Sequence, residues 1–349
     1  MSLVAPFPWF GGKRRVASIV WDALGRDPAA GGVRHYVEPF AGRLAALLHA
    51  PAGRVETVND ADGLLANFWR ATKMHPAEVA EAADWPVNEA DLHARHLWLV
   101  GQRETLTERL MADPDWCDPK AAGWWVWGCS AWIASGWCSG DGPWQAVDGV
   151  FVRGDAGLGV HRKRPHLGNA GRGVHSASAG GVARKLPHPG NAGRGMHGAS
   201  ADIRATMAAL SERLRHARVA CGDWSRVCGP SVLAAASGPV GVFLDPPYAM
   251  GDHVIGRAEL YSVEDGAVSA SVRAWALDAG RNPNARIVLA GYDDEHEMPG
   301  WRVVEWKAKG GYCNIGGSNS TSRGAANAHR ERLWFSPGCL DPTRQGLLL

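Results

Sequence analysis

The run VFLDPPY at residues 242–248 constrains this chain more than any other stretch. Three apolar residues, typical of a buried strand, lead into an acid, two prolines and an aromatic ring. Strand pairing must end at Pro246 and Pro247, because proline has no amide hydrogen and a fixed φ. Ligands of open α/β sheets bind just outside the carboxyl ends of the strands. We therefore expect Asp245 and the carbonyl groups of this turn to accept hydrogen bonds from a planar amine that stacks on Tyr248; a plain surface turn is the alternative.

The composition is that of a globular protein of two or three domain-sized units, with 349 residues of which 46% are hydrophobic and 21% charged. No apolar run approaches the ~18 residues of a membrane span, and the first residues lack the charged start and apolar core of a signal peptide. Seven cysteines without a CxxC pair argue against a disulfide framework and a zinc knuckle. We expect a cytoplasmic protein that needs no metal and no membrane.

The first 75 residues alternate between glycine turns and the apolar periods of helices and strands. Gly11-Gly12-Lys13 lets the backbone approach a ligand beside a positive charge, although such a sequence is commonly only a turn. A helix is predicted at residues 15–24, with a core face of Val16, Ile19, Val20 and Ala23. Further along we expect a strand from residue 35 into a turn at Gly42, a helix at 44–49, a strand at 54–59 and a helix at 63–74.

Asp60 is a candidate ligand residue just after the predicted strand at residues 54–59. It lies 18 residues after Gly42, near the spacing at which the acid of a nucleotide-binding βαβ unit meets ribose hydroxyls. The alternative is that it caps the helix at residues 63–74, and the two roles can be divided between Asp60 and Asp62.

The middle of the chain is rich in tryptophan. After a helical stretch at residues 76–110, six tryptophans fall within residues 124–144. They predict the hydrophobic core of an inserted subdomain; the alternative is that a few rings line a DNA cleft and stack on bases at about 1–3 kcal/mol each. The C-terminal part predicts helices at 202–216 and 268–278, strands at 219–224, 241–244, 286–290, 301–306 and 331–335, a loop at 251–261 and a Gly/Ser/Asn-rich segment at 310–327.

A basic tandem repeat lies between these parts. The segment 159–175 recurs 22 residues later as 181–197, and no acid lies between Asp155 and Asp202. Such a segment cannot form its own core and should be mobile without a partner. A solubilising linker is one interpretation, but DNA contact is favoured, because cations neutralise phosphate and glycines let the backbone follow a groove. The candidate DNA-binding residues are Arg162, Lys163, Arg164, Arg172, Arg184, Lys185 and Arg194.

Four motifs, taken in order, resemble those of the DNA adenine methyltransferase family. They are Pro8-Trp9-Phe10-Gly11-Gly12-Lys13, Glu38-Pro39-Phe40-Ala41-Gly42, Asn59-Asp60 and Asp245-Pro246-Pro247-Tyr248. The chain is similar to the subgroup in which the cofactor motifs come first and the catalytic motif last, with target recognition between them. It departs from the family pattern after Gly42, where Arg43-Leu44 replaces a small residue and a glycine. Arg43 would either add a cofactor contact or crowd the methionine carboxylate.

The resemblance implies an α/β fold with a Rossmann-like class I methyltransferase sheet, helices on both faces and an inserted target-recognition region. Residues 1–75 and 202–338 would form a discontinuous catalytic domain that binds S-adenosyl-L-methionine. Residues 76–201 would form the insert, helical and Trp-rich at 76–150 and basic and Gly-rich at 159–200, and residues 339–349 a tail.

The resemblance also implies the roles of single residues. Asp245, Pro246, Pro247 and Tyr248 would be catalytic. The cofactor would contact Trp9, Gly11, Gly12, Lys13, Glu38, Phe40, Gly42, Asp60, Asp223 and Asp245; Asp223 would bind the adenine amino group or, alternatively, cap a helix. The implied reaction transfers a methyl group to N6 of an adenine flipped out of double-stranded DNA, in restriction–modification or phage protection, in a bacterial or phage-infected cytoplasm.

Three other functions remain as alternatives. The first is methyl transfer to another amino group, in cytosine N4, RNA or a glutamine side chain; glutamine enzymes of this fold typically carry Asn where Asp245 stands. The second is an inactive DNA-binding protein of the same fold. The third is an interaction protein that acts through the repeat at residues 159–197.

Overall fold

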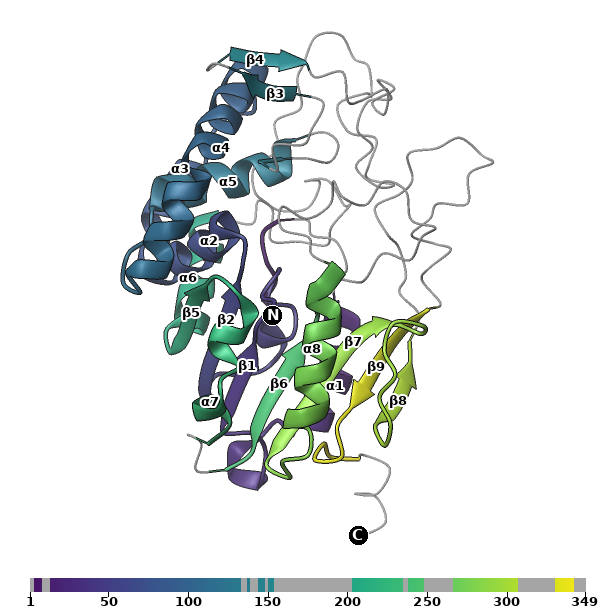
Figure 1. Cartoon of the computed structure of the whole chain (residues 1–349). Helices are drawn as coiled ribbons and strands as arrows, with labels where there is room; N and C mark the ends of the chain where they lie inside the picture. The colour runs from purple at the N-terminus through teal and green to yellow at the C-terminus, as the bar shows by residue number, and fades with distance from the viewer. Residues whose placement is uncertain are drawn as a thin grey trace, which may run out of the picture.

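The computed structural model describes residues 3–7, 13–132, 137–138, 144–147, 150–153, 203–234, 238–247, 266–306 and 330–341. Its centre is a seven-stranded sheet of order β5-β2-β1-β6-β7-β9-β8 (Figure 1). The strands from β5 to β7 in this order are parallel, and β9 runs antiparallel to both β7 and β8. The fold is therefore α/β with a mixed, mostly parallel sheet. The strands are β1 (His35–Glu38), β2 (Val55–Asp60), β5 (Ala217–Cys221), β6 (Val240–Leu244), β7 (Ala285–Tyr292), β8 (Arg302–Glu305) and β9 (Glu331–Phe335).

The central strands β6 and β7 are buried along their whole length, as expected for parallel strands with helices on both faces. Successive side chains of β6 enter different cores: Phe243 joins the cluster that contains α1 (Ala17–Leu24) and α2 (Gly63–Met74), and Leu244 joins the one that contains α8 (Gly266–Ala279). This alternation is the period of a strand. Figure 1 shows α8 across the near face of the sheet and α1 behind it.

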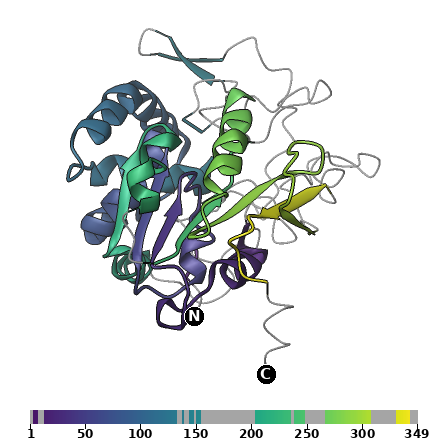
Figure 2. The same ribbon diagram turned by 60° about the horizontal axis from the view of Figure 1, so that its bottom comes forward.

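Helices α3 (Pro76–Ala83), α4 (Glu89–Ala112) and α5 (Pro119–Ala131) form a group beside the sheet (Figure 2). All three pack on α2, and α3 also packs on α6 (Ile203–Leu214). None of the helices in the described ranges is long and apolar enough to cross a membrane. The remaining elements are the short helix α7 (Pro230–Ala234) and a hairpin of β3 (Trp144–Val147) and β4 (Val150–Arg153).

Two of the three tryptophans of α5 lie in the hydrophobic core. Trp125 and Trp127 are 3% and 0% exposed, so the core interpretation is confirmed for these two rings. The Trp127 indole nitrogen donates to the Trp85 carbonyl at 2.8 Å, and the Trp137 indole nitrogen donates to the Trp125 carbonyl at 3.0 Å. A side chain at Gly128 would collide with the Trp137 ring, which explains the glycine in this helix.

Most predicted elements are confirmed to within a few residues, but three predictions are wrong in part. Residues 44–49 do not form a helix: Leu44 has a φ of 51°, in the left-handed region, and only a short 3₁₀ helix, Leu47–His49, follows. Ile19 was expected in the core and is 36% exposed, because the buried face of α1 is centred on Val20, Trp21 and Leu24. The predicted strand at 219–224 ends at Cys221, and Trp224 opens a 3₁₀ helix, Trp224–Val227.

Candidate functional site

The carboxyl ends of β1 and β6 lie side by side, because these strands are parallel neighbours. Glu38 is the last residue of β1, and Asp245 directly follows β6. The order of the sheet reverses here: β2 and β5 extend from β1 to one side, and β6 and β7 to the other (Figure 1). Ligands of open α/β sheets bind outside such a switch point. The pairing of β6 with β7 reaches Leu244 and stops before Pro246, as the two prolines predict.

Lys13 brings a buried positive charge to this edge. Its ammonium nitrogen lies 3.0 Å from Asp245 Oδ1 and 3.4 Å from Glu331 Oε2, and 5.7 Å from the centre of the Trp306 ring. The Lys13 side chain is 3% exposed and that of Asp245 is 23% exposed. Lys13 belongs to a 3₁₀ helix, Lys13–Arg15, that precedes α1. The predicted site residues Lys13 and Asp245, from distant parts of the chain, are thus in direct contact.

Glu38 is a buried carboxyl group beside this pair. Its Oε2 accepts hydrogen bonds from the Tyr36 hydroxyl at 2.9 Å and the Leu47 amide at 3.3 Å. Burial raises the pKa of Glu38 to about 8, and the negative charge of Asp245 also raises it. Glu38 therefore holds a proton at neutral pH and places an uncharged acid next to Asp245.

We expect the free energy of unfolding to fall between pH 4.5 and pH 8 because of Glu38. Its pKa is about 8 in the folded chain against an ordinary 4.5, so over this range the unfolded chain releases a proton that the folded chain keeps. Urea denaturation at pH 5 and pH 8 measures the difference. Glu38→Gln should lose less stability over this range than the wild type, whereas Glu212→Gln, at a side chain 72% exposed, should behave like the wild type. An equal change in the free energy of unfolding between pH 5 and pH 8 in all three proteins would contradict the raised pKa of Glu38.

A hydrogen bond joins Gly42, which follows β1, to Asp60, which ends β2. The Gly42 amide donates to Asp60 Oδ2 at 3.0 Å, and the Asp62 amide donates to Asp60 Oδ1 at 2.9 Å. Burial, and secondarily the nearby charge of Asp62, raises the pKa of Asp60 to about 7. The capping role falls to Asp62, whose Oδ1 accepts from the Leu64 amide at the start of α2 at 2.9 Å. Asp60 instead shapes the glycine turn after β1.

Asn59 is a site residue whose contacts the sequence does not reveal. Its side-chain amide donates to the Pro39 carbonyl at 3.1 Å and to the Gly222 carbonyl at 2.9 Å. The loops after β1, β2 and β5 are thereby fastened together. The adjacent Asp60 is the one signal in the sequence for this position, since a buried amide at a strand end carries no pattern of its own.

The loop after β5 completes the edge with an acid and an aromatic pair. Asp223 Oδ1 accepts from the Ser225 amide at 2.9 Å and from the Ser225 hydroxyl, so the alternative prediction, that Asp223 caps a helix, holds for the short helix Trp224–Val227. Asp223 is exposed and retains further acceptor capacity. The rings of Phe40 and Trp224 are stacked, with centres 6.3 Å apart and planes inclined by 27°.

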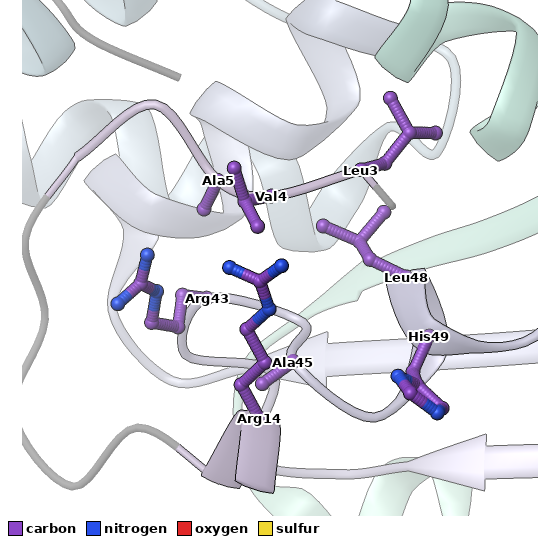
Figure 3. A pocket seen from close by; sticks show the side chains of 8 residues that line it. All are labelled: Leu3, Val4, Ala5, Arg14, Arg43, Ala45, Leu48 and His49. Carbon is purple, nitrogen blue, oxygen red and sulfur yellow. The ribbon is translucent and has the colours of Figure 1, made fainter. Parts of the chain in front are cut away.

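Arg43 lies along the side of a hollow near the N-terminal segment (Figure 3). Arg14 reaches into the middle of the same hollow. The other lining residues are Leu3, Val4, Ala5, Ala45, Leu48 and His49.

Several predicted site residues lie outside the described ranges. These are Trp9, Gly11, Gly12 and Tyr248, the seven basic residues Arg162, Lys163, Arg164, Arg172, Arg184, Lys185 and Arg194, the predicted loop at 251–261 and the segment at 310–327. The other predicted site residues are described. All but Lys13 end a strand of the parallel part of the sheet or follow one, and Lys13 contacts Asp245. They are Lys13, Glu38, Phe40, Gly42, Asp60, Asp223, Asp245, Pro246 and Pro247.

No family model matches this chain, and no curated protein matches its sequence significantly. A functional hypothesis for this protein therefore depends on its motifs and on the geometry at the sheet edge.

Proposed function

We propose that this protein is an S-adenosyl-L-methionine-dependent DNA methyltransferase that modifies adenine at N6. The observation that carries the proposal is the position of Asp245-Pro246-Pro247 at the carboxyl end of β6, at the switch point of the sheet and in contact with Lys13. The mixed α/β sheet supports a class I methyltransferase fold, with residues 76–201 as the target-recognition insert. The proposed setting is a bacterial or phage-infected cytoplasm.

The chemistry of the edge suits an adenosyl cofactor. Asp60 is a half-buried carboxyl group at the glycine turn, where an acid accepts hydrogen bonds from ribose hydroxyls. Asp223 offers an exposed acceptor for an amino group, and the half-buried ring of Phe40 offers an apolar face for a base. S-adenosyl-L-methionine, when bound, supplies the methyl group.

The residues of the protein would orient the target amine. Adenine N6 is hidden in duplex DNA, so the base must be flipped out at a cost of a few kcal/mol. Tyr248 stacks on the flipped ring, and Asp245 and the Pro246 carbonyl accept the two amino hydrogens. The nitrogen lone pair then points at the methyl donor. Catalysis by orientation and electrostatics needs no covalent enzyme intermediate.

The direct test is methylation of double-stranded DNA with a labelled methyl donor, followed by digestion to nucleosides. We expect the label in N6-methyldeoxyadenosine alone. Label in N4-methylcytosine, or methylation of RNA or a glutamine side chain in parallel incubations, would replace adenine with another amino group. Cofactor binding measured by calorimetry without turnover would instead indicate an inactive DNA-binding protein.

We expect the basic repeat to carry a large part of the affinity for DNA. Each cation that meets a phosphate releases a counterion, so seven such contacts would make log K fall with log salt at a slope of about −6 at most. Replacing all seven Lys and Arg residues of 159–197 by Gln should weaken binding and flatten this slope in fluorescence anisotropy titrations. The control is Arg215→Gln with Arg281→Gln, at side chains 64% and 81% exposed. An unchanged slope in the repeat variant would exclude phosphate contact by the repeat.

A further inference from the structure

The Lys13 ammonium is held between two carboxylates that come from different strands. Asp245 follows β6, and Glu331 is the first residue of β9. The distances from the Lys13 nitrogen are 3.0 Å to Asp245 and 3.4 Å to Glu331, and the side chains of Lys13 and Glu331 are 3% and 9% exposed. A buried ammonium group is costly unless it is paired, so both acids contribute to keeping it charged at this place.

The reversed direction of β9 is what brings Glu331 to the ligand-binding edge. β9 is antiparallel to β7, and Glu331 pairs with Tyr292, the last residue of β7. The amino end of β9 therefore lies at the edge where β6 and β7 have their carboxyl ends. The backbone of Glu331 is fixed as well, because its carbonyl accepts from the Trp306 amide at 3.3 Å and from the Arg332 guanidinium at 3.1 Å.

We infer that Glu331 is a positioning residue of the candidate catalytic site, which holds the Lys13 ammonium in place beside Asp245. Asp245 would then keep one oxygen on Lys13 and present the other toward the target amine. With Glu331 present, one cation is shared by two carboxylates, so Asp245 retains more of the negative charge that makes it a good acceptor. The effect on catalysis rests on the proposed methyltransferase function; the contact itself does not.

The first experiment replaces the charge of Glu331 and keeps its size. We expect Glu331→Gln to lower kcat for DNA methylation by about tenfold, with KM for DNA and for S-adenosyl-L-methionine changed less than about twofold, since the lost interaction acts in the transition state. Glu331→Asp keeps the charge and should recover part of kcat, which a merely structural role would not predict. The control is Glu305→Gln on β8, at an acid that is 78% exposed and pairs with Arg332, the residue after Glu331 on β9.

The second experiment tests the ion pairs without measuring catalysis. Lys13→Met leaves the buried Glu331 and the half-buried Asp245 without their shared cation and should lower Tm by about 5 °C. Adding Glu331→Gln to Lys13→Met should restore part of this loss, so the two substitutions are not additive. Additive shifts in Tm, or an unchanged kcat in Glu331→Gln, would overturn the inference. If the wild-type protein methylates nothing, the proposed function fails, and the melting temperatures still decide for or against the contact.

Discussion

Asp245→Ala should lower kcat for adenine methylation by about a thousandfold or more, because the preorganised acceptor of the amino hydrogens is lost. The loss should appear in kcat rather than in DNA affinity, since Asp245 acts on the reacting nitrogen. Asp245→Asn keeps the shape of the side chain and removes its charge, and should retain an activity between those of Asp245→Ala and the wild type. Transfer of labelled methyl groups under saturating DNA and cofactor measures these values.

The matched control for this prediction is Asp278→Ala. Asp278 lies on α8, its side chain is 82% exposed, and it pairs with Arg281 on the surface. We expect wild-type activity from this variant, and thermal denaturation of all variants to show that each is folded. Activity near the wild-type level in Asp245→Ala would remove Asp245 from the proposed mechanism.

Arg213→Ala should lower the free energy of unfolding by about 3–5 kcal/mol, because it removes the hydrogen-bonded partner of the buried Glu56 carboxylate and leaves it the longer, 3.9 Å pair with Arg54. Arg213 on α6 donates two hydrogen bonds to Glu56 of β2, at 2.6 and 2.9 Å, and Glu56 is 1% exposed. The same guanidinium also donates to the carbonyls of Leu47 and Ala50 at 2.7 and 3.0 Å. This cluster joins a helix after the proposed insert to a strand before it.

Urea denaturation at neutral pH measures this effect as a lower midpoint at an unchanged m-value. Arg215→Ala is the control on the adjoining turn, where the side chain is 64% exposed and lies 3.7 Å from Glu212. A surface pair of this kind contributes about 0–1 kcal/mol. Similar midpoints for the two variants would mean that the Arg213 cluster does not stabilise the fold.

Predictions of strands and amphipathic helices succeeded where the spacing of apolar residues along a segment matches the face that the segment buries. The run before Asp245 forms β6, and residues 63–74 form α2 with the predicted bounds. The prediction failed at residues 44–49, whose apolar run indicated a helix. There the left-handed Leu44 and the bond from the Leu47 amide to buried Glu38 decide the backbone, and neither is encoded in local periodicity.

In the candidate site too, residues that belong to short motifs could be predicted from the sequence, whereas contacts between distant segments could not. Asp245, Gly42 and Asp60 are recognisable because each belongs to a short pattern of adjacent residues. Glu331 carries no such pattern, and the motif that contains Asn59 does not reveal its contacts. The contacts of both residues reach loops or strands that are distant in the chain. The side-chain exposure of Lys13, at 3%, follows from packing at the sheet edge and cannot be read from a basic residue beside two glycines.

By itself, the amino-acid sequence determined where the strand before Asp245 must end, since two prolines remove the amides that pairing needs. It also determined the order of the candidate motifs along the chain. Only the tertiary structure decided which charges meet: the reversal of the sheet between β1 and β6 places Glu38 beside Asp245, and the antiparallel direction of β9 brings Glu331 to Lys13. The physical reason is that strand order and direction arise from the packing of the whole sheet. No single segment of the sequence contains the information that fixes them.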